Sequence, residues 1–150
     1  MTAGVDSPLG PLVLTEEGGA ITALDWGACG TAPNSDVTRQ AAGELAAYFA
    51  GRLTDFTVPL APRGSGFQQA FYHALCAIPF GETRTYGDLA GALGVSAQAI
   101  GQACGANPIP VLIPCHRVLG ATGLGGYSGA GGVETKLALL RLEGAGGFLL

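Results

Sequence analysis

Residues 107–118 read NPIPVLIPCHRV, and the prolines in this segment strictly limit its backbone. Pro108, Pro110 and Pro114 fix φ and lack an amide donor, so the segment can neither continue a helix nor occupy the centre of a sheet. A chain that is already stiff loses little entropy when it orders. The sequence therefore predicts a rigid loop that holds Cys115 in a fixed direction, directly before His116.

The first third of the chain shows the pattern of a small β-rich lobe. Two apolar stretches, residues 9–14 and 20–26, are joined by a polar, glycine-containing turn. This arrangement is typical of a β-hairpin. A helix is expected to begin at Ser35 or Asp36, either of which can cap it, and to end at about Arg52.

The stretch before the proline-rich loop resembles a helix-turn-helix. Thr85 and Asp88 have the spacing of a capping box, which predicts a helix over residues 86–93. Gly94 breaks this helix where the turn needs a left-handed backbone, and a second helix is expected to reach about Ala106. The residues of the second helix also fit an ordinary helical hairpin, so this pattern does not establish DNA binding by itself.

These patterns predict an α+β protein with two parts. Residues 1–62 are expected to form the β-rich α/β lobe, and residues 63–150 a mainly helical lobe that contains the helix-turn-helix. The segment APRGSG, residues 61–66, is interpreted as the linker between them. A last helix is expected over residues 133–143.

The overall charge argues against a protein that binds nucleic acid through a general positive field. The formal net charge is −4, so contacts with phosphate must come from a local cluster of cations. The sequence shows neither a signal peptide pattern nor an apolar run long enough to span a membrane, and we expect a cytoplasmic location. The four cysteines lack metal-ligand spacing, so we expect free thiols, and neither a metal nor another cofactor.

Cys115 and His116 suggest nucleophilic chemistry. A free thiol has a pKa of about 8.5, so a base must assist it at neutral pH. A histidine that is oriented by a carboxylate can supply that base. Neighbouring side chains seldom face each other, and His116 is therefore expected to act through a bridging water. The alternative is a cysteine buried in the core, which is the usual environment of this residue type.

The motif around Cys115 resembles the active-site signature of the O6-alkylguanine-DNA alkyltransferases, also called methylated-DNA–protein-cysteine methyltransferases. The resemblance includes Pro-Cys-His-Arg-Val and the preceding Asn-Pro, and it extends over residues 66–144. It implies a ribonuclease H-like first lobe, a monomer, and a helix-turn-helix in the minor groove of double-stranded DNA. It further implies that an alkylated guanine is flipped out of the duplex into a pocket.

The resemblance assigns a role to each matching position. Cys115 would accept the alkyl group irreversibly, His116 would be its base, and Glu143 would orient His116. Tyr86 would assist base flipping and protonate the departing guanine, and Asn107 would brace the active-site loop. The remaining positions, which would line the pocket or cover the base, are Pro110, Val118, Cys104, Tyr127 and Ser128.

One position departs from the family. Gln98 stands where most members carry an arginine that fills the space left by the flipped base. Glutamine can hydrogen-bond there but lacks the planar cation. Among the few cations of this lobe, we expect Arg84 and Lys136 to contact phosphates.

Two other functions compete with alkyl transfer. Gln98 and the negative net charge are also compatible with the hypothesis of a non-catalytic protein that binds alkyl lesions and recruits other factors. A cysteine hydrolase is a third hypothesis, although the sequence offers it no evident oxyanion site.

Overall fold

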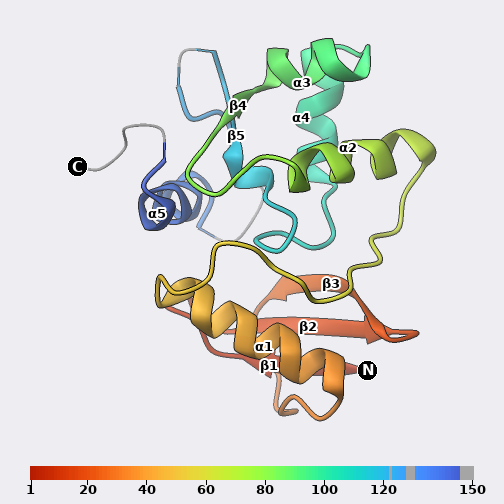
Figure 1. Cartoon of the computed structure of the whole chain (residues 1–150), viewed down its shortest axis with the longest axis vertical. Helices are drawn as coiled ribbons and strands as arrows, with labels where there is room; N and C mark the ends of the chain where they lie inside the picture. Colours follow the sequence, from red (N-terminus) through yellow and green to blue (C-terminus); the bar gives the residue numbers. More distant parts are fainter. Residues whose placement is uncertain (122, 128–130, 146–150) are drawn as a thin grey trace. The chain divides into compact units, whose positions relative to one another are not determined.

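The protein was analysed as a computed structural model, which describes residues 1–121, 123–127 and 131–145. Its internal contacts divide the chain into two compact units, Met1–Arg63 and Gly64–Leu150. Figure 1 traces the chain through both. Within the described ranges, no helix combines the length and the apolar character that crossing a membrane requires.

The first unit is built on an antiparallel sheet of three strands. These are β1 (Thr2–Val5), β2 (Leu12–Glu17) and β3 (Ala20–Trp26), in the order β1-β2-β3. The predicted hairpin is confirmed as β2–β3, whereas β1 was not predicted. Gly18 and Gly19 both have positive φ in the hairpin turn, 59° and 83°. Such turns favour glycine because a side chain strains a left-handed backbone.

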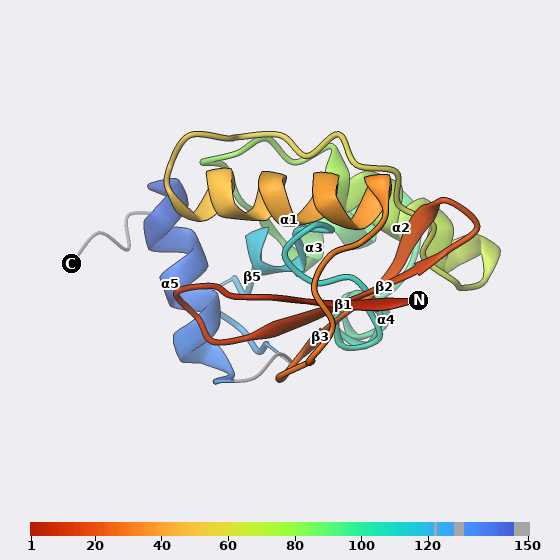
Figure 2. The ribbon, with the colours of Figure 1, turned by 90° about the horizontal axis from the view of Figure 1, so that it is seen from below.

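Helix α1 (Asp36–Phe49) lies along one face of this sheet, as Figures 1 and 2 show. The Ser35 side chain accepts a hydrogen bond from the Thr38 amide, so the cap lies where the sequence predicted it. The helix stops earlier than expected because Gly51 turns the chain with φ of 76°. The buried side chains of the sheet and the helix form one apolar core, which includes Leu12, Leu14, Ile21, Leu24, Ala41, Leu45 and Tyr48.

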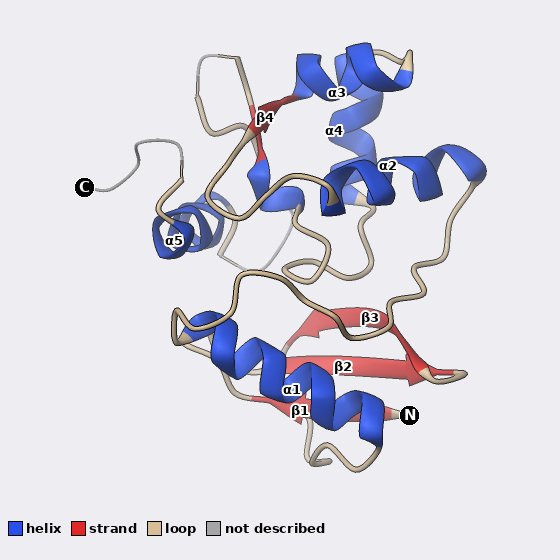
Figure 3. Ribbon diagram, in the orientation of Figure 1, coloured by secondary structure: helices blue, strands red, loops and turns tan. Residues whose placement is uncertain are grey.

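The second unit is mainly helical, as predicted (Figure 3). Its elements are α2 (Gly66–Cys76), β4 (Arg84–Thr85), α3 (Tyr86–Leu93), α4 (Ala97–Gly105), the 3₁₀ turn η1 (Cys115–Arg117), β5 (Val118–Leu119) and α5 (Val133–Glu143). The short parallel pair β4–β5 was not predicted; it aligns Arg84 with Val118. Two-residue strands carry no periodicity that a sequence could reveal.

Helices α3 and α4 confirm the helix-turn-helix. Thr85 and Asp88 make the reciprocal capping box, and the helix begins at Tyr86. Gly94 ends α3 in the left-handed region with φ of 69°, and its amide donates to the Ala90 carbonyl. Ser96 then caps α4 through the Ala99 amide. Capping residues and one glycine therefore fix the turn that positions α4.

This turn can be tested with a matched pair of glycines. Gly94→Ala places a Cβ on a left-handed backbone, and we expect a loss of about 1 kcal/mol in the free energy of unfolding. Gly91 lies inside α3, and a Cβ there would meet no other atom within 4 Å. Gly91→Ala should therefore be neutral or stabilising by about 0.5–1 kcal/mol. Urea denaturation of both variants measures the difference, and equal stabilities would contradict this account of the turn.

Candidate active site

The loop before Cys115 is held by the side chain of Asn107. Its Nδ2 donates to the Ile113 carbonyl at 2.9 Å, and its Oδ1 accepts from the Ile109 amide at 3.0 Å. Between these points the chain reverses at Val111, which has φ of 72° and is the one non-glycine residue with positive φ in the part of the chain that the structure describes. A β-branched residue in this region is strained. The bracing by Asn107 maintains the strained conformation.

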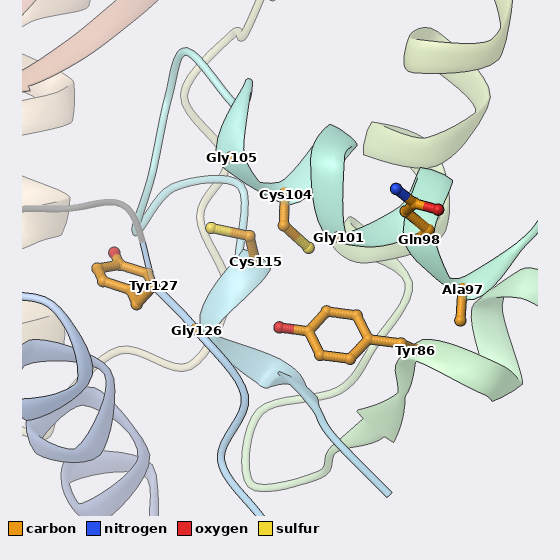
Figure 4. Close-up of a pocket in the computed structure, with 9 residues that line it drawn as sticks. All are labelled: Tyr86, Ala97, Gln98, Gly101, Cys104, Gly105, Cys115, Gly126 and Tyr127. Carbon is orange, nitrogen blue, oxygen red and sulfur yellow. The ribbon is translucent and has the colours of Figure 1, made fainter.

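Cys115 opens onto a cavity of about 610 Å³. The side chain is 5% exposed and stands at the first residue of η1. Figure 4 shows the cavity between α4, Tyr86 at the start of α3, and the segment that ends at Tyr127. The residues that line it are Tyr86, Ala97, Gln98, Gly101, Cys104, Gly105, Cys115, Gly126 and Tyr127.

The surroundings of Cys115 influence its ionisation in opposite directions. Burial raises the pKa of the thiol, because the thiolate loses hydration. The hydrogen bond with the Asn107 side chain and the nearby ammonium of Lys136 lower this pKa and offset part of the increase. The thiol is therefore protonated at neutral pH, so a nucleophilic role requires a base.

A buried carboxylate organises the residues behind Cys115. Glu143 Oε2 lies 2.8 Å from His116 Nε2, and both side chains are fully buried. Arg117 donates to the same carboxylate through Nε at 2.8 Å and through a terminal nitrogen at 3.0 Å. Another terminal nitrogen of Arg117 donates to the Ile78 carbonyl at 2.6 Å. The sequence predicted the pairing of His116 with Glu143 only by resemblance, and it did not predict that Arg117 shares Glu143.

His116 is neutral in this environment. Burial lowers its pKa, and this effect outweighs the opposing influence of Glu143. A neutral imidazole carries one proton, and the carboxylate at Nε2 favours the tautomer with that proton on Nε2. Nδ1 is then a lone-pair acceptor; it is buried and makes no hydrogen bond with any described residue.

Two tyrosines contribute to the cavity wall. Burial raises the pKa of Tyr86, and the neighbouring Cys104 and Cys115 raise it further, so the phenol keeps its proton at neutral pH. Tyr127 also has its pKa raised by burial, and its hydroxyl finds no hydrogen-bond partner within the described part of the chain. Tyr86 can therefore act as a proton donor to a molecule in the cavity.

The prediction that Lys136 contacts phosphate is wrong. Its side chain is fully buried, and the ammonium donates to the carbonyls of Leu124 and, at 3.1 Å, Gly126. It also lies 5.7 Å from the centroid of the Tyr86 ring, within the range of a cation–π contact. Lys136 holds the segment that lines the cavity. It lies four residues before Leu140 and seven before Glu143, both buried, so the helical period could have revealed that it faces inward.

Other predicted positions have different surroundings. Val118 is fully buried in β5 and does not line the cavity, which corrects the prediction made for it. Pro110 likewise lies outside the lining. Arg84 is partly exposed but pairs with Glu82 at 3.3 Å, so a phosphate would compete with that carboxylate. Ser128 lies outside the described residues.

The exposed face of α4 is small and uncharged. Residues 89–115 contain neither an acidic nor a basic side chain, and Ala97, Gln98, Gly101 and Gly105 line the cavity from this helix. Gly126, which completes the lining, was missed because its place in a glycine-rich loop carries no periodic signal.

Comparisons with known proteins cover both units of the chain. The family described as "6-O-methylguanine DNA methyltransferase, ribonuclease-like domain" matches residues 2–62, and "6-O-methylguanine DNA methyltransferase, DNA binding domain" matches residues 66–145. Among curated relatives, the methylated-DNA–protein-cysteine methyltransferase of Mycobacterium tuberculosis strain H37Rv is 45% identical, covering 93% of this chain and 89% of the relative. The protein of the same name from Methanosarcina acetivorans is 49% identical over 75% of this chain and 72% of the relative.

Solved structures agree with these matches. A crystal structure of Mycobacterium tuberculosis OGT in complex with DNA superposes with a TM-score of 0.84 at 43% identity, covering 95% of this chain and 92% of that one. A crystal structure of the Mycobacterium tuberculosis O6-methylguanine methyltransferase gives a TM-score of 0.83 at 44% identity, with 96% and 93% covered. The expected ribonuclease-like first lobe and helical second lobe are thereby confirmed. With matches to the profiles of both domains and close relatives over nearly its whole length, the chain belongs to the methylated-DNA–protein-cysteine methyltransferase family of DNA repair proteins.

Proposed function

We propose that this methyltransferase takes the alkyl group of an O6-alkylguanine onto Cys115, once per molecule. The observation that carries the assignment is a nearly buried thiol that opens onto a cavity, with the His116–Glu143 pair behind it. Cys104 also lines the cavity, but burial raises its pKa to about 12. Cys115 is therefore the better nucleophile of the two.

In the proposed mechanism, His116 removes the thiol proton through one water molecule. The hydrogen bond to Glu143 leaves Nδ1 of His116 as the basic nitrogen. This buried atom makes no hydrogen bond with a described residue, so it can accept one from the bridging water. Glu143 stabilises the imidazolium that results. Arg117 keeps Glu143 ionised and in place, since two of its nitrogens donate to the carboxylate.

Alkyl transfer then proceeds by displacement at carbon. The electron pair of the Cys115 sulfur forms the new S–C bond, and the C–O6 bond breaks with its electrons moving to guanine. Tyr86, whose hydroxyl faces the cavity, donates a proton to the departing base. The product is a thioether that no group in the cavity can cleave, so the protein is consumed. A protein that only binds lesions would not need a thiol, a base and a proton donor around one cavity, so this set of residues favours alkyl transfer.

We further propose how the protein meets DNA. Helix α4, with its small and uncharged exposed face, enters the minor groove of a duplex, and Gln98 fills the space that the flipped guanine leaves. Arg84 is the candidate phosphate contact. Residues 63–150 would carry both the DNA contact and the chemistry, and residues 1–62 would form a separate domain. Since one chain supplies the whole set of residues, a monomer suffices.

The acceptor can be tested by intact-protein mass. Incubation with a duplex that contains O6-methylguanine should add one methyl group per molecule, located in the tryptic peptide of residues 85–117. Cys115→Ala should gain nothing, whereas Cys76→Ala, altered at an exposed cysteine outside the cavity, should react like the wild type. A methyl group on another residue, or lesion binding without a mass gain, would overturn the assignment.

The ionisation of Cys115 predicts its pH profile. Because burial raises the pKa of Cys115 above the ordinary range of a thiol, its alkylation by iodoacetamide in the absence of DNA should keep accelerating beyond pH 9. Cys29 is an internal control: a hydrogen bond from the Thr31 backbone lowers its pKa, so its rate should level off at lower pH. Peptide mass spectrometry separates the two sites. If the alkylation rate of Cys115 levelled off at a lower pH than that of Cys29, the raised pKa of Cys115 would be contradicted.

Replacing Lys136 should slow methyl transfer while leaving the acceptor, Cys115, intact. Lys136→Met retains the apolar stem but removes the ammonium that holds the Leu124 and Gly126 carbonyls. We expect methyl transfer to slow by about 10- to 100-fold, because the cavity wall is no longer positioned. The pH profile of Cys115 should also move to higher pH. Arg39→Met, which makes the same charge change on an exposed side chain of the first unit, serves as the control and should leave both measurements unchanged.

A further inference from the structure

The cavity contains a second thiol beside the acceptor. Cys104, in the last turn of α4, lines the same cavity as Cys115, and both cysteines are free. The charge of a Cys115 thiolate raises the pKa of Cys104, which places the two groups within electrostatic range. Figure 4 shows their side chains next to each other on the cavity wall. Cys29 and Cys76 do not line this cavity.

The backbone fixes the separation of these two cysteines through Asn107. The Asn107 amide donates to the Cys104 carbonyl at 3.3 Å, and its side chain donates to the Ile113 carbonyl at 2.9 Å. The Cys115 amide donates to that same Ile113 carbonyl at 2.8 Å. One side chain therefore joins the ends of the loop, and the entropy of bringing residues 104 and 115 together is already lost in the folded protein.

Side-chain rotation is the remaining requirement for a bond between the sulfurs. In Figure 4 the sulfur of Cys115 points toward Tyr127 and that of Cys104 points toward Tyr86. Rotation about a Cα–Cβ bond moves a sulfur between staggered positions, and both side chains line the same cavity.

We propose that Cys104 is a resolving cysteine, which forms a reversible disulfide with Cys115 when a peroxide has oxidised the acceptor. The Cys115 thiolate attacks one oxygen of the peroxide, forming a sulfenic acid and releasing hydroxide, or an alkoxide from an organic peroxide. The Cys104 sulfur then attacks the sulfenic sulfur, forming the S–S bond and releasing water. Two thiols are oxidised by two electrons in total, and the peroxide is reduced.

The disulfide would control the proposed acceptor, and this consequence rests on the assignment of alkyl transfer to Cys115. The disulfide removes the nucleophile, so the oxidised protein cannot accept an alkyl group. It also prevents further oxidation of Cys115 to the sulfinic acid, which thiols do not reverse. Since burial keeps both thiols protonated at neutral pH, formation should be slow there and faster at higher pH.

The test uses the full chain and hydrogen peroxide. After treatment, free thiols are blocked with iodoacetamide and the protein is digested with trypsin. Residues 85–117 form one tryptic peptide, which contains Cys104 and Cys115 and neither of the other cysteines. We expect this peptide to lose the mass of two hydrogens and to take up no blocking group. Reduction with dithiothreitol should restore both thiols and, with them, methyl transfer.

Two serine variants make the result decisive. Cys104→Ser cannot form the bond, so peroxide should convert Cys115 to sulfinic acid, and dithiothreitol should restore several-fold less acceptor than in the wild type. Cys76→Ser should behave as the wild type. The proposal is overturned if the wild-type peptide shows oxidised Cys115 without the loss of two hydrogens, or if Cys104→Ser recovers equally. The mass readout needs no DNA, so it stands even if methyl transfer to Cys115 should fail its own test.

Discussion

The carboxylate of Glu143 is the interaction on which the rest of the site depends. It is buried, so its charge must be neutralised within the protein, and Arg117 does this with two hydrogen bonds. The same carboxylate holds His116. Since Arg117 also binds the Ile78 carbonyl, one ion pair joins α5, η1 and the segment that follows α2. The residue that we propose as the base, His116, is thus held by the same ion pair that joins these elements.

Helix α5 contributes a second buried charge with a different task. Lys136 lies two helical turns before Glu143 and holds the segment around Gly126. The ammonium also favours the thiolate of Cys115 and of Cys104. One helix therefore holds His116, the proposed base, through the carboxylate of Glu143, and it holds the cavity wall through the ammonium of Lys136. This arrangement leaves few cations for DNA, since Arg117 and Lys136 are both buried.

In the complex that we propose, the uncharged face of α4 would give the DNA contact an unusual physical basis. Affinity for DNA commonly comes from cations that displace counterions. The residues of α4 that line the cavity are small or carry an amide. In the proposed complex, shape complementarity and hydrogen bonds would therefore supply a larger share of the affinity for DNA. The same small residues leave space beside Cys115 for a second sulfur. The small residues of α4 are thus compatible with both proposals, the close approach to a duplex and the disulfide between Cys104 and Cys115.

The sequence by itself determined the elements whose signals are local. The capping residues at 35, 85 and 96 and the left-handed glycine at 94 act within one turn of chain. The starts of α1, α3 and α4 and the end of α3 lie where these residues predicted, whereas α1 ends earlier than expected. The resemblance named Cys115, His116 and Glu143 as site residues. The structure places Cys115 on the cavity and pairs His116 with Glu143, and the roles of these residues stay predictions. Tertiary structure alone decided the partners of buried charges, because Arg117 meets a carboxylate 26 residues away and Lys136 meets carbonyls rather than phosphate. Whether a charge is buried depends on what packs over it, and that is a property of the assembled fold.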